Sequence, residues 1–100
     1  MNFLEITAQF EAQIRLHLEI ELLETNYSVY SFGSGFSAYR ITGITFIIIY
    51  DGRDNLIYLK RSKHHEKYPN CSWIEIFSGV PDDFFQKGIN IIKNEIKNKN

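Results

Sequence analysis

The sequence predicts one α+β domain over residues 1–100, an antiparallel meander sheet of four to five strands flanked by an N-terminal and a C-terminal helix. Residues 2–24 contain no Gly or Pro and are rich in Leu, Glu, Ala and Gln, which favour a helix. Residues 27–77 alternate between β-branched or aromatic runs and turn residues, which is typical of short strands. A second helical pattern follows Pro81. A chain of this length can bury one core without a metal or a disulfide.

The N-terminal segment carries two competing patterns. Apolar residues from Phe3 to Leu22 recur at steps of three, four or seven, as on one helix face. Between Ile14 and Leu22, apolar residues also alternate strictly with polar ones, as in a half-buried strand. Length and strong helix formers favour a helix over residues 2–24, and a strand over residues 14–22 stays open as the alternative.

The strands are expected at five runs separated by turn residues. Ile44–Tyr50 is apolar at nearly every position, which predicts a central strand covered on both faces. Thr42 and Gly43 suit a two-residue hairpin turn between two of these runs. The expected strands are Tyr27–Phe32, Phe36–Ile41, Ile44–Tyr50, Leu56–Arg61 and Ser72–Phe77.

The C-terminal helix has a well-marked start. Pro81 suits the first helical position, and Asp82 and Asp83 place negative charge in the first turn, where the helix dipole favours it. Gly88 interrupts the apolar stripe, and we expect it to permit a close approach to the sheet.

The composition predicts a cellular compartment and argues against two classes of partner, membranes and nucleic acids. The single cysteine, Cys71, cannot form an internal disulfide, and residues 1–11 lack the layout of a signal peptide, so we expect a cytoplasmic protein. The longest apolar run, residues 46–50, is too short to span a membrane. A net charge of −1 makes nucleic acid an unlikely partner on grounds of affinity for phosphate.

No motif predicts catalysis, a metal or a cofactor. His64, His65 and Glu66 match no standard zinc spacing, and a solvated loop is the better interpretation. Gly33-Ser34-Gly35 lacks the lysine of a phosphate loop and leads into a strand. Cys71 is interpreted as an ordinary, partly buried cysteine. The protein is therefore predicted not to be an enzyme.

Charge is unevenly distributed along the chain. Residues 1–26 sum to −4, whereas residues 60–67 and 84–100 each sum to +3. Such asymmetry indicates a partner or mutual packing, and an acidic helix face would suit a basic partner. The candidate partner-binding residues combine this acidic stretch with one charged turn and the tryptophan: Glu11, Arg15, Glu19, Glu21, Glu24, Asp51, Arg53, Asp54 and Trp73.

Four segments between residues 30 and 79 resemble small bacterial immunity proteins of contact-dependent or other polymorphic toxin systems. They are Tyr30–Phe36, Tyr50–Asp54, His65–Pro69 and Trp73–Gly79. The resemblance implies specific capture of one toxin domain, with the acidic face blocking the substrate path of a basic nuclease and occluding its active site.

Two other interpretations stay open. One is a small ligand-binding or enzymatic domain with a pocket lined by Tyr39, Tyr50, Tyr58 and Trp73. The other concerns assembly, because an edge strand or a helix could make the chain a homodimer instead of a monomer.

Overall fold

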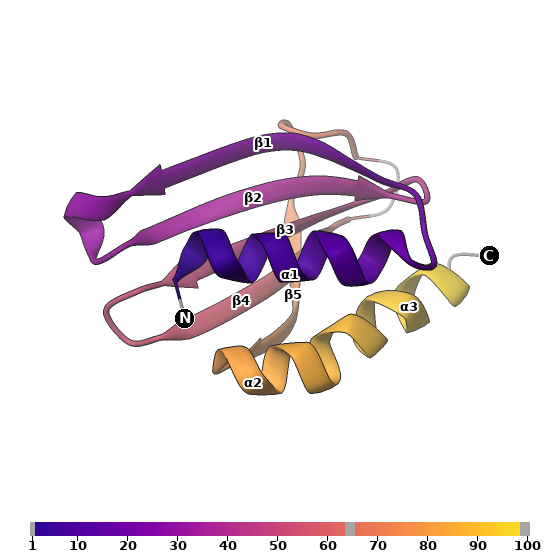
Figure 1. Ribbon diagram of the computed structural model, residues 1–100. Helices are drawn as coiled ribbons and strands as arrows, with labels where there is room; N and C mark the ends of the chain where they lie inside the picture. Colours follow the sequence, from indigo (N-terminus) through magenta and orange to yellow (C-terminus); the bar gives the residue numbers. More distant parts are fainter. Residues whose placement is uncertain (1, 64–65, 99–100) are drawn as a thin grey trace.

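The fold, taken from a computed structural model, is described for residues 2–63 and 66–98 and consists of one five-stranded sheet with helical segments before and after it (Figure 1). The sheet order is β1-β2-β3-β4-β5, and every neighbouring pair is antiparallel, which confirms the predicted meander and its α+β class. The elements are α1 (Phe3–Arg15), β1 (Ile20–Ser28), β2 (Ser34–Ile41), β3 (Ile44–Asp51), β4 (Leu56–Ser62), β5 (Trp73–Gly79), α2 (Pro81–Asp83), a π-helical turn (Phe84–Gly88) and α3 (Ile89–Lys97).

Both helical segments pack on the same face of the sheet, and the core lies between them and the strands (Figure 1). Phe10 of α1 joins the three parts, because its ring centroid lies 5.2 Å from that of Tyr39 on β2 and 5.8 Å from that of Phe84 in the π-helical turn. All three rings are fully buried. The predicted central strand is confirmed, since β3 has two neighbours and is buried along nearly its whole length.

The expected helix over residues 2–24 is wrong in its second half. The helix begins after Asn2, whose side-chain oxygen accepts the Glu5 N–H at 2.9 Å, and it ends at Arg15. Ile20 then opens β1 and pairs with Ile41 of β2. The strand alternative for residues 14–22 is also wrong in its first part, because Ile14 and Arg15 belong to the helix and residues 16–19 connect it to β1. Ile20 packs against the core, whereas Leu22 is 46% exposed.

The first expected strand, Tyr27–Phe32, is also displaced. β1 ends at Ser28, a 3₁₀ turn covers Val29–Ser31, and Phe32 has a φ of +58° that no strand residue adopts. The remaining strands are confirmed within one or two residues at each end. Thr42 and Gly43 both have positive φ, which is the two-residue hairpin geometry that their positions predicted.

The face of the sheet away from the helices, here called the second face, is partly covered by the β4–β5 hairpin. A bulge shifts the register of β4 and β5 beside Leu59, and β5 crosses behind the other strands in Figure 1. The connection after β4 reaches β1, where the Tyr68 hydroxyl donates to the Glu24 carboxylate. Ala38 and Ile47 are buried on this face although no helix covers them.

The C-terminal helix starts as predicted, with Pro81 at its first position. A Cβ on Gly88 would lie 2.7 Å from the ring of Phe84, so this glycine makes room for a side chain of the preceding helical turn, and its expected role in approach to the sheet stays a prediction. Glu95 of α3 accepts from the Arg61 guanidinium of β4 at 2.6 Å, which fastens the helix to the sheet.

Candidate protein-binding surface

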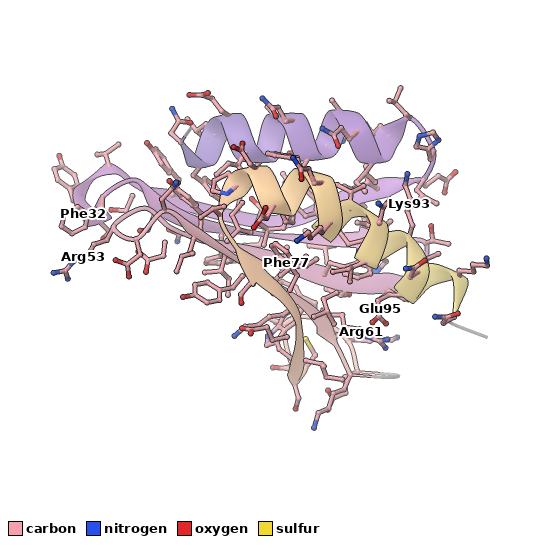
Figure 2. The ribbon with its side chains drawn as sticks, turned by 90° about the horizontal axis from the view of Figure 1, so that it is seen from below. Phe32, Arg53, Arg61, Phe77, Lys93 and Glu95 are labelled. Carbon is pink, nitrogen blue, oxygen red and sulfur yellow. The ribbon has the colours of Figure 1, made fainter. Side chains whose placement is uncertain are left out.

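The turns that follow β1 and β3 meet at one end of the sheet and expose a group of apolar side chains. Tyr30 is 96% exposed, Phe32 68% and Val29 62%. Arg53, from the turn between β3 and β4, lies beside Phe32 at this end of the molecule (Figure 2). Val29, Tyr30, Phe32 and Arg53 are called the tip surface below. Large exposed rings gathered with an arginine are typical of protein-binding sites.

The backbone beneath the tip surface is held firmly. A Cβ on Gly52 would lie 1.9 Å from the Phe32 carbonyl oxygen, so the two turns touch at a point where only glycine fits. The Gly52 N–H donates to the Ser34 hydroxyl at 2.9 Å. Asp51 accepts the N–H groups of Arg53 and Asp54 at 3.0 and 3.4 Å. The side chains of the tip are thus presented by a pre-organised loop pair.

Phe32 itself occupies a costly conformation. Its φ of +58° lies in the left-handed region, which a bulky side chain adopts rarely and at a cost of roughly 1–2 kcal/mol. Packing in the core gives the Phe32 ring little stabilisation, because the ring is mostly exposed to solvent. The left-handed conformation of Phe32 serves the turn that joins β1 to β2, as positive φ does at Thr42 and Asn55 in the next two turns.

The end of β1 next to the turn packs against α1. Tyr27 stacks on Phe3 of α1 with ring centroids 5.8 Å apart and planes inclined by 10°. Beyond it, a row of half-buried apolar side chains crosses the second face next to the tip, where Phe36, Ile49 and Tyr58 are opposed on β2, β3 and β4. The apolar surface therefore continues from the tip surface onto the sheet.

The predicted acidic residues do not share one helix face. Glu11 lies on α1, where its carboxylate accepts from Tyr39 at 3.0 Å and from Arg15 at 3.5 Å. Glu19 follows the helix, and Glu21 and Glu24 lie on β1. Their charge is partly neutralised, and their role in partner binding stays a prediction.

Apart from Glu11 and Glu24, the predicted residues lie in three separate places: a groove near the turn between β2 and β3, the start of β5, and the turn at the tip end. Glu21 pairs with Arg40 at 3.0 Å, and both line an open groove of about 630 Å³ together with Arg15 and Glu19, near the turn between β2 and β3. Trp73 lies at the start of β5, with its ring centroid 6.2 Å from that of Tyr68. Of the nine predicted residues, Asp51, Arg53 and Asp54 share the turn at the tip end.

Three hydroxyl and thiol groups are held in their neutral forms. Burial raises the pKa of Tyr39 well above the usual tyrosine range, and the nearby Glu11 carboxylate adds to this. The hydrogen bond to Glu24 raises the pKa of Tyr68 to about 12. Burial raises the pKa of the Cys71 thiol, which disfavours a nucleophilic thiolate.

The four aromatic residues that were expected to line one pocket lie on opposite faces of the sheet. Strand alternation turns Tyr39 and Tyr50 toward the helices, whereas Tyr58 and Trp73 belong to the second face. Within the described residues, no group of three or more His, Cys, Asp or Glu side chains could hold a metal ion, and His64 and His65 lie outside those residues.

The exposed residues that the sequence interpretation missed are Val29, Tyr30 and Phe32, because it assigned them to a strand. The sequence carries one signal for this turn, because Gly33 directly follows Phe32. A turn that contains a glycine can also include the residues before it.

Comparisons with protein-family models, with curated proteins and with solved structures find no match to this chain. In the part of the chain that the structure describes, no helix combines the length and apolar character needed to cross a membrane.

Proposed function

We propose that this chain is a protein-binding domain that captures its partner at the tip surface. The observation that carries the proposal is the exposure of Tyr30 and Phe32 on a loop pair whose backbone is locked by Gly52. Tyrosine and arginine are enriched among residues that dominate binding energy, and Tyr30, Phe32 and Arg53 supply two rings and one guanidinium. A rigid loop loses little conformational entropy when it docks, which favours affinity.

The resemblance to immunity proteins suggests what the partner is. We propose a cognate toxin, or another effector protein, that the domain inhibits in the bacterial cytoplasm by occluding its active site. A projecting, rigid hairpin end suits insertion into a concave site on such a partner. The role follows from binding, so it requires no catalytic residue and no cofactor in this chain.

Site-specific photo-crosslinking tests the proposal. A photoreactive p-benzoylphenylalanine replaces Tyr30 in one variant and Leu16 in a second. Leu16 is the matched control because it is 77% exposed but lies just after α1, away from the tip. The immunity proteins that this chain resembles sit beside toxin genes, so the chain is co-expressed with an inactivated product of the gene that neighbours its own. We expect a crosslink from position 30 and none from position 16, whereas equal crosslinking from both would contradict the proposal.

A further inference from the structure

Arg53 differs from the other arginines because it has no carboxylate partner among the described residues. Arg15, Arg40 and Arg61 lie 3.5, 3.0 and 2.6 Å from Glu11, Glu21 and Glu95. Among residues 2–63 and 66–98, no carboxylate oxygen lies within 4.0 Å of the Arg53 guanidinium. The Arg53 guanidinium carbon instead lies 5.7 Å from the centroid of the Phe32 ring. This stacking leaves the N–H groups at the edge of the guanidinium available to a partner.

The two aspartates of the same turn, Asp51 and Asp54, do not form an ion pair with the Arg53 guanidinium. The Asp51 carboxylate oxygen is used by the turn, where it accepts the backbone N–H groups of Arg53 and Asp54. Asp54 is exposed. Because the turn carries two carboxylates and one guanidinium, its overall charge does not attract polyanions. A ligand has to be recognised at short range, by paired hydrogen bonds to Arg53.

Resting on the proposed function, we propose that the Phe32–Arg53 pair receives a single carboxylate of the partner protein, an Asp or Glu side chain flanked by apolar residues. A guanidinium and a carboxylate form two parallel, charge-assisted hydrogen bonds. Tyr30 and Phe32 would be covered at the same time, which excludes water and strengthens the ion pair. The ring holds the guanidinium by a cation–π contact before binding, so less side-chain entropy is lost.

Small probes can test this without the partner. The wild-type domain is titrated with 3-phenylpropionate, with its neutral match 3-phenylpropionamide and with phenyl phosphate, while ¹H–¹⁵N spectra follow the Arg53 Nε and the backbone amides of residues 30–34 and 52–54. We expect shifts confined to these groups and about tenfold tighter binding of the carboxylate than of the amide, since one charge-assisted pair is worth roughly that factor.

Three variants sharpen the result. Arg53→Gln should reduce the carboxylate preference to about onefold, and Arg53→Lys should restore only part of it because lysine lacks the planar fork. Asp54→Asn should tighten carboxylate binding about twofold or more, because it removes from the same turn a negative charge that repels the carboxylate of the probe. Equal affinity for the carboxylate and the amide would overturn the inference, and so would tighter binding of phenyl phosphate, which would indicate a phosphate ligand.

The two proposals can fail separately. A crosslink from position 30 together with no carboxylate preference would sink this inference and leave the protein-binding function standing. A carboxylate preference that Arg53→Gln abolishes, with no crosslink from position 30, would support carboxylate recognition and contradict the proposed protein partner.

Discussion

Replacing Gly52 with alanine should disrupt the tip surface through a steric conflict that the structure locates. The new Cβ would lie 1.9 Å from the Phe32 carbonyl oxygen and 2.8 Å from its carbonyl carbon. Ordinary carbon–oxygen contacts are about 3.3 Å or longer, so the two turns have to separate by more than roughly 1 Å. Forced shifts of this kind cost about 1–3 kcal/mol, and the hydrogen bond from Gly52 to Ser34 would weaken as well.

Urea unfolding and the Arg53 Nε chemical shift measure the two consequences of Gly52→Ala. The free energy of unfolding should fall by about 2 kcal/mol, and the Arg53 Nε shift should move because the guanidinium leaves the Phe32 ring. Gly43→Ala is the control: its φ of +83° makes alanine cost about 1–2 kcal/mol, but it lies in the turn between β2 and β3. If Gly52→Ala is as stable as wild type and leaves the Arg53 signal in place, the two turns do not lock each other as described.

Three further predictions concern the supports of the fold. Glu95→Gln should lower the free energy of unfolding by about 1–3 kcal/mol, because it leaves the largely buried Arg61 without its charged partner. Glu21→Gln, at the exposed pair with Arg40, should lower it by under about 0.5 kcal/mol. Similar losses for the two variants in urea titrations would refute this ranking. The fold raises the pKa of Tyr39, so the contribution of Tyr39 to the free energy of unfolding is complete below pH about 10. This contribution declines as pH rises toward the folded pKa, by up to about 1.4 kcal/mol per pH unit. Tyr39→Phe should flatten this alkaline decline, and an unchanged slope would contradict the prediction. Tyr68→Phe should speed amide exchange over residues 66–72 while it changes the unfolding free energy by under about 1 kcal/mol, and unaltered exchange would show that the bond to Glu24 does not hold the hairpin.

The parts of the fold that sequence reasoning predicted are those fixed by local chemistry. Thr42-Gly43 is a two-residue turn because glycine tolerates positive φ, and Pro81 opens a helix because its missing N–H is not needed there. Ile44–Tyr50 is central because an uninterrupted apolar strand requires cover on both faces. Each of these features can be inferred from a few neighbouring residues.

The parts that could not be predicted depend on distant pairing. Residues 14–22 satisfy a helical and a strand period at once, and the structure divides them: the helix ends at Arg15, and only residues 20–22 pair with the edge of β2. The second face of the sheet is partly covered by β5 and the connection before it, which depends on the bulge beside Leu59 and on the long-range contact between Tyr68 and Glu24. Neither leaves a periodic signal in the sequence.

The candidate site was predicted in part. Asp51-Gly52-Arg53-Asp54 was recognised as a charged turn, and it does lie at the tip surface. The aromatic half was missed because Tyr30 and Phe32 have strong strand propensity, and their exposure arises from the turn geometry at Phe32 and the close approach of Gly52. The acidic residues were grouped by sequence proximity, but the break between α1 and β1 distributes them over different elements.

The most direct test of the central claim is the dissociation constant for the inactivated product of the neighbouring gene, measured by calorimetry. The variant Tyr30→Ser with Phe32→Ser is compared with Leu4→Ser and Leu16→Ser, which remove two exposed leucines of the α1 region and serve as the control. We expect the tip variant to weaken binding at least about 100-fold, as the loss of two binding hot spots would, while the control stays within about threefold of wild type. Equal affinity of the tip variant and wild type would contradict it.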